Sequence, residues 1–90
     1  MELLDAQKNI LVKNIKVCEN FDGSSWIEIS IQTFNSLTDD AKQKLRQIAN
    51  GSFFSSFFIK SDFGVIKQCE IHGSNFDDRI LKIYFDWKNF

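Results

Sequence analysis

The most constraining feature of this sequence is the alternation of apolar and polar side chains over residues 79–88, RILKIYFDWK. Successive side chains of a β-strand point to opposite faces, so the large apolar groups of this segment gather on one face. They are Leu81, Ile83, Phe85 and Trp87. Each gives roughly 1.5–3 kcal/mol when fully buried. The segment therefore predicts a strand whose apolar face is covered by a second layer.

Two segments nearer the N-terminus predict a β-hairpin. Residues 10–18 are rich in β-branched side chains, but the apolar side chains switch from one face of the strand to the other part-way along it. This strand is therefore either apolar on both faces or bulged near Lys13 and Asn14. Residues 26–33 alternate cleanly, with Ile27, Ile29 and Ile31 inward, and the intervening 20–24 contain Asp-Gly, a strong hairpin signal. Residues 2–8 are expected to form either one helical turn or a frayed end.

One helix is predicted over residues 35–50. Thr38 or Ser36 can cap its N-terminus, and Asn50-Gly51 can end the helix through a residue in the left-handed backbone conformation. Its apolar stripe consists of Leu37, Ala41, Leu45 and Ile48. This stripe is the expected cover for the inward faces of the strands.

The C-terminal half predicts three strands. Residues 52–60, SFFSSFFIK, fit either a helix or a strand, and a strand is favoured because Phe and Ser are poor helix formers. Residues 65–72 form the next strand, and 73–78 turn the chain into 79–88. The order ββαβββ over residues 1–90 predicts a single two-layer α+β domain. Its antiparallel sheet has about five strands, with one helix packed on one face.

Composition argues against several classes of protein. Eleven Lys and Arg residues against twelve Asp and Glu give a net charge of −1, unlike the basic balance of proteins that bind phosphate backbones. The N-terminus lacks the pattern of a signal peptide, and no segment approaches the ~20 apolar residues of a membrane span. Cys18 and Cys69 are therefore expected to be reduced thiols in a cytoplasmic protein.

The sequence contains no motif whose residues could act together in catalysis or ligand binding. Cys69 and His72 form C-x-x-H, but residues three apart on a strand point to opposite faces and cannot chelate one ion. The four glycines are isolated, so the sequence has no phosphate-binding loop. We expect no metal, no cofactor and no enzymatic activity.

Acidic and aromatic side chains are among those that point outward from the predicted strands. They are Trp26, Glu28, Glu70, His72, Tyr84 and Asp86. This set fits a solvated sheet face, a paired-carboxylate acid–base site or a protein-binding face, and binding is favoured because Trp and Tyr are enriched at interface hot spots. A homodimer is also possible. The alternative is a small nucleic-acid-binding or regulatory domain that uses the helix cations Lys42, Lys44 and Arg46.

In general character the chain resembles small bacterial immunity proteins, which neutralise a toxin by binding it. The residues behind the comparison are the outward set above together with Asp22, Asp77 and Asp78 in the adjoining turns. The resemblance implies a compact, non-catalytic, cytoplasmic inhibitor whose partner is a toxin or effector enzyme. The near-neutral charge departs from the strongly acidic pattern of nuclease inhibitors. Phage-encoded inhibitors of host defence have the same physical profile.

Overall fold

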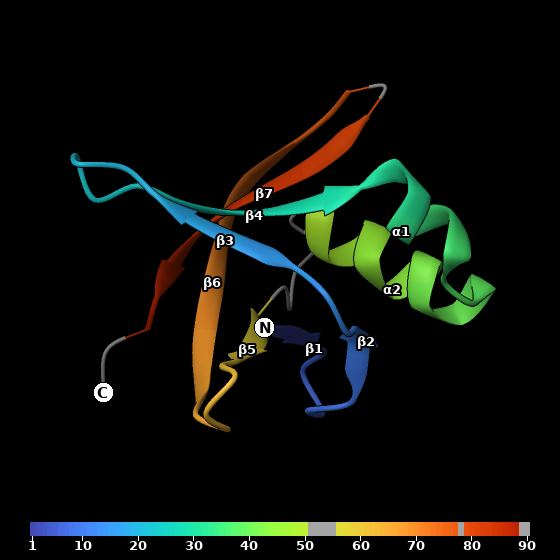
Figure 1. Ribbon diagram of the computed structural model, residues 1–90, viewed down its shortest axis with the longest axis horizontal. Helices are drawn as coiled ribbons and strands as arrows, with labels where there is room; N and C mark the ends of the chain where they lie inside the picture. Colours follow the sequence, from blue (N-terminus) through green and yellow to red (C-terminus); the bar gives the residue numbers. More distant parts are fainter. Residues whose placement is uncertain (51–55, 78, 89–90) are drawn as a thin grey trace.

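The computed structural model describes residues 1–50, 56–77 and 79–88, which form an antiparallel sheet and two helices (Figure 1). The elements are β1 (Glu2–Leu4), β2 (Ile10–Val12), β3 (Lys16–Glu19), β4 (Ser25–Ser30), α1 (Ile31–Ser36), α2 (Asp39–Ala49), β5 (Ser56–Lys60), β6 (Ile66–Phe76) and β7 (Ile80–Trp87). The sheet has seven strands in the order β2-β1-β5-β6-β7-β4-β3 and curls into a half-barrel. The α+β class and the antiparallel sheet are confirmed, whereas five strands and one helix were wrong.

The two extra strands come from the N-terminal quarter. Residues 2–4 form β1 rather than a helical turn, because Leu3 pairs with Ile59 of β5 and is completely buried. The predicted strand 10–18 is divided into β2 and β3. The division falls where the apolar side chains change face. That change therefore marks the break between two strands rather than a bulge within one strand.

The predicted helix 35–50 corresponds to α2 and the last two residues of α1, and the rest of α1 stands where the end of the strand 26–33 was predicted. β4 ends at Ser30 instead of continuing to residue 33, because the Ser30 side chain accepts a hydrogen bond from the Thr33 backbone N–H at 3.1 Å and caps α1. Thr38 caps α2 in the same way, accepting from the Ala41 backbone N–H at 3.2 Å. Ile31 therefore lies in α1, although its alternation with Ile27 and Ile29 suggested a strand.

The core lies between the inner face of the sheet and the helices. Five of the predicted inward residues of β4 and β7 are buried there, namely Ile27, Ile29, Leu81, Ile83 and Phe85, whereas Trp87 is only partly buried against this cluster. Leu45 and Ile48 of α2 belong to the same cluster, as the predicted stripe requires. The strand interpretation of 52–60 is confirmed over β5, where Phe57 is buried and Phe58 lies on the opposite side. Gly51, Phe53 and Phe54 lie outside the described residues.

β6 is longer than the sequence suggested. It continues through Phe76, so the turn predicted over 73–78 was wrong for its first four residues. Ile71 pairs with Phe85 and Gly73 with Tyr84, which leaves His72 as an extra residue in a β-bulge. Asp78 lies outside the described residues.

Asp5 organises the turn between β1 and β2. Its Oδ1 atom accepts hydrogen bonds from the backbone N–H groups of Gln7 and Asn9, at 2.9 and 2.8 Å. Lys44 of α2 lies 3.4 Å from the other carboxylate oxygen, and Asp5 is 4% exposed. Burial by itself raises the pKa of Asp5, but the two backbone donors and Lys44 together hold it below its usual value.

Asp5→Ala should lower the free energy of unfolding by about 1.5–3 kcal/mol, because two backbone donors and Lys44 lose their acceptor. The lowered pKa means that the contribution of the Asp5 charge is present above the unfolded-state pKa, near 4, and is lost as the pH falls through the native value. Urea titrations between pH 3 and 7 measure both effects. Asp62→Ala, at an exposed carboxylate, is the matched control. Equal losses in the two variants would contradict the assignment.

Candidate protein-binding face

The six residues predicted to bind a partner lie on the face of the sheet turned away from the core. We call this surface the outer face and define it by Trp26, Glu28, Glu70, His72, Tyr84 and Asp86. The strand register brings them together in cross-strand pairs. Trp26 lies opposite Tyr84 on β4 and β7, and Glu70 lies opposite Asp86 on β6 and β7. Glu28 lies on β4, two residues from Trp26.

An aromatic pair occupies the middle of the outer face. The ring centroids of Trp26 and Tyr84 are 6.2 Å apart, with an interplanar angle of 44°. Trp26 is half-buried and Tyr84 is 36% exposed. Tyr and Trp combine large apolar area with few rotatable bonds, so such a pair offers contact area at low entropic cost.

Glu28 orients the tryptophan instead of acting as a free charge. The indole N–H of Trp26 donates to Glu28 Oε1 at 3.1 Å. Lys16 Nζ lies 4.0 Å from Glu28 Oε2, and Lys82 is the cross-strand neighbour of Glu28 on β7. Because lysines flank Glu28 on both adjoining strands, this part of the outer face carries no excess of negative charge.

The acidic part of the face is formed by Glu70 and Asp86. Carboxylates directly opposite on neighbouring strands repel each other. The β-bulge places the imidazole of His72 within hydrogen-bond reach of Asp86, through Nε2 and Oδ2. The side chains of His72 and Asp86 are 58% and 61% exposed. A cation from a partner can therefore reach this cluster and relieve the repulsion between the two carboxylates.

A hollow of about 360 Å³ adjoins this cluster and includes Ser24 from the β3–β4 turn. Ser24, His72 and Asp86 resemble the residue types of a hydrolase triad. However, the hydroxyl of Ser24 donates to Asp22 at 2.7 Å rather than to His72. A nucleophile must be hydrogen-bonded to its base, and this geometry does not supply that contact. Glu28 and Glu70 do not line the hollow, so it is not a paired-carboxylate pocket.

The basic surface proposed for nucleic acid is divided between two sides of α2. Lys42 and Arg46 are four residues apart and lie over the ring of Phe34, at 6.0 and 5.5 Å from its centroid. Lys44 faces the other way and forms ion pairs with Asp5 and Asp40, at 3.4 and 3.5 Å. The three cations therefore do not form one patch.

Sequence reasoning missed the lysines and the cysteine that lie beside the predicted residues. Lys16 and Lys82 flank Glu28, and Cys18 is the cross-strand neighbour of Trp26. The alternation of each strand already shows that the side chains of these residues point outward. Their positions beside Glu28 and Trp26, however, depend on a register that only the paired strands define.

The two thiols should react very differently in the native protein. Cys69 is buried, and burial raises its pKa to about 12, whereas Cys18 is partly exposed. Because the thiolate is the reactive form, we expect Cys69 to be alkylated at least about a hundredfold more slowly than Cys18 at pH 8. Mass spectrometry of iodoacetamide-treated protein measures both rates, and Cys18→Ser should remove the fast phase. Similar native rates at both sites would contradict this assignment.

Comparison with known proteins gives no match to a family model, a curated protein or a solved structure. Among residues 1–50, 56–77 and 79–88, His, Cys, Asp and Glu form no group of three or more suited to a metal ion. In the same part of the chain, both helices are too short or too polar to cross a lipid bilayer.

Proposed function

We propose that this chain is a non-catalytic protein-binding module of the immunity or inhibitor kind, which uses the outer face to occlude a toxin or effector enzyme. The observation that carries the proposal is the preorganised Trp26–Tyr84 pair beside an exposed carboxylate cluster. The hydrogen bond from Trp26 to Glu28 holds the indole in place before binding. Less conformational entropy is therefore lost when a partner docks.

The carboxylate cluster on one side of the aromatic pair favours a basic partner. Glu70 and Asp86 lie opposite each other on the neighbouring strands β6 and β7, and Asp22 lines the adjoining hollow. Together they can occupy the position of the anionic groups that a basic active site binds. Electrostatic attraction of this kind raises the association rate and decreases as salt is added.

Capture of the partner with matched charge variants tests the proposal. Glu70→Lys combined with Asp86→Lys should abolish capture that the native protein shows, since both side chains are exposed and the fold should persist. The control is Asp62→Lys combined with Glu2→Lys, which makes the same charge change near the N-terminus and should leave capture intact. Equal capture by both double variants would exclude the outer face.

A second measurement locates the interface directly. Cys18 lies beside Trp26, so alkylation of Cys18 should slow at least about fivefold when the partner is bound. Inhibition is tested by titrating the chain into the partner's own activity, which should be lost at a 1:1 ratio. An unchanged Cys18 rate, or a partner that stays fully active, would contradict the corresponding part of the proposal.

A further inference from the structure

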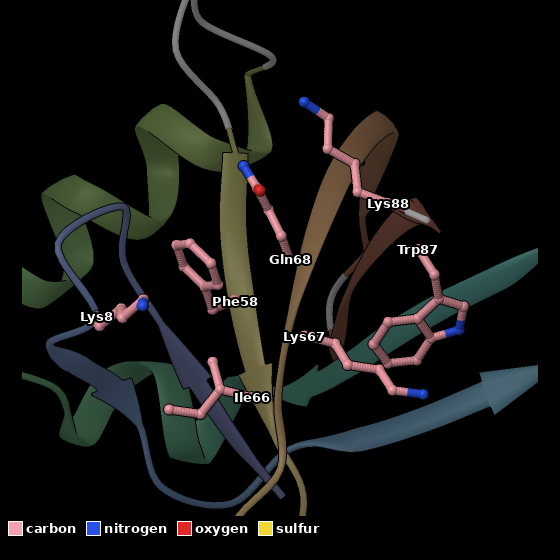
Figure 2. A pocket seen from close by; sticks show the side chains of 7 residues that line it. All are labelled: Lys8, Phe58, Ile66, Lys67, Gln68, Trp87 and Lys88. Carbon is pink, nitrogen blue, oxygen red and sulfur yellow. The ribbon is translucent and has the colours of Figure 1, made fainter. Parts of the chain in front are cut away.

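A separate open groove lies where β7 ends against β6. It has a volume of about 670 Å³ and is lined by Phe58, Ile66, Gln68 and Trp87, with Lys8, Lys67 and Lys88 at its rim (Figure 2). None of these residues lines the hollow beside Asp86. The groove is therefore a second candidate site, and it does not depend on the function proposed for the outer face.

The floor of the groove is apolar and accessible. Phe58 projects from β5 on the side opposite to the buried Phe57, and Ile66 of β6 is 42% exposed. The indole N–H of Trp87 donates to Glu19 Oε1 at 3.3 Å, so the polar atom of this side chain already has a partner. Trp87 is the cross-strand neighbour of the buried Cys69, so it lies on the other side of β6 from Phe58 and Ile66. Apolar contact with a ligand would therefore come mainly from Phe58 and Ile66.

The rim of the groove is cationic. Lys8 Nζ lies 5.3 Å from the centroid of the Phe58 ring, and Lys67 Nζ lies 5.5 Å from that of Trp87. These distances are typical of cation–π contacts, which hold the ammonium groups beside the apolar floor. The ion pairs in the described part of the chain involve other cations. Within that part, Lys8, Lys67 and Lys88 therefore form no ion pair with a carboxylate.

The three ammonium groups are dispersed rather than convergent. Lys8 comes from the β1–β2 turn, Lys67 from β6 and Lys88 from the end of β7. Figure 2 shows their nitrogen atoms at separate places around the groove. A compact phosphate group is best held by cations or backbone donors that point at one position. An elongated ligand with several separated negative charges fits this distribution better.

We propose that the groove binds an extended acidic peptide segment that carries apolar side chains. An extended peptide rises about 3.3 Å per residue and turns alternate side chains to opposite sides. An apolar side chain can therefore contact Phe58 and Ile66 while neighbouring carboxylates reach the lysines at the rim. The charge of the rim selects against basic segments of the same shape.

Binding is tested with the full chain and a capped pentapeptide, Glu-Leu-Glu-Phe-Glu, followed by nitrogen-15 NMR. We expect shifts of the Gln68 side-chain amide and the Trp87 indole N–H, with the Trp26 indole N–H unchanged. The basic analogue Lys-Leu-Lys-Phe-Lys and inorganic tripolyphosphate should bind at least about fivefold more weakly. Tighter binding of tripolyphosphate, no shift with the acidic peptide, or shifts centred on Trp26 would each overturn the proposal.

Matched charge reversals separate binding in this groove from attraction of the peptide to lysines elsewhere on the protein. Lys67→Glu and Lys88→Glu should each weaken peptide binding at least about fivefold, since each replaces an attraction at the rim by a repulsion. Lys13→Glu makes the same charge change in the exposed β2–β3 connection and should alter affinity by less than about twofold. An equal loss in Lys13→Glu would overturn the proposed site.

Discussion

Replacing Phe85 with alanine should lower the free energy of unfolding by about 3–5 kcal/mol. Phe85 is 1% exposed, and its ring packs edge-on against Phe57 and Trp87, with centroids 5.8 and 4.9 Å away. A domain of this length has a total stability of about 5–13 kcal/mol. The substitution therefore removes a large part of the total, and urea denaturation followed by circular dichroism measures the loss.

Two further variants show whether the loss comes from a cavity in the core. Phe85→Leu keeps most of the apolar volume and should cost about 1–2 kcal/mol. Phe63→Ala removes an equally large ring at the β5–β6 turn, where the side chain is 96% exposed, and should change stability by less than about 0.5 kcal/mol. A loss at Phe85 no larger than the loss at Phe63 would contradict the position of Phe85 at the centre of the core.

Local alternation was enough to predict which way the side chains of β4 and β7 point. The inward positions Ile27, Ile83 and Phe85 are buried as expected, since strand periodicity is a property of neighbouring residues. The number of strands was not predictable in this way. β1 has only three residues, and its pairing with β5 joins segments more than 50 residues apart. Its short sequence carries no periodic signal of its own.

The candidate face was predicted more accurately in its membership than in its electrostatics. Trp26, Glu28 and Tyr84 do share the outer face, but the sequence did not show that Glu28 binds the indole or that lysines flank it. Those contacts follow from the register of separate strands. The division of the helix cations was accessible from helical spacing alone, because residues two apart, such as Lys42 and Lys44, point to nearly opposite sides.

Replacing Trp26 with alanine should weaken binding of the proposed partner by about 2–4 kcal/mol, or roughly 30- to 900-fold. Trp26 lies against Tyr84 and is oriented by Glu28, so the substitution removes both the largest contact and part of the support for its neighbour. Isothermal titration calorimetry with the captured partner measures the loss. Circular dichroism of the variant checks that the sheet is intact.

Conservative variants distinguish an interface anchor from a residue that only supports the sheet. Trp26→Phe retains a ring without the indole N–H and should lose less affinity than Trp26→Ala. Glu28→Gln keeps an acceptor for the indole and should cost less than about 1 kcal/mol of binding, because Glu28 acts mainly by orientation. Phe63→Ala removes an exposed ring away from the outer face and should bind normally. If Phe63→Ala and Trp26→Ala weakened binding equally, the Trp26–Tyr84 pair would not be the anchor of this interface.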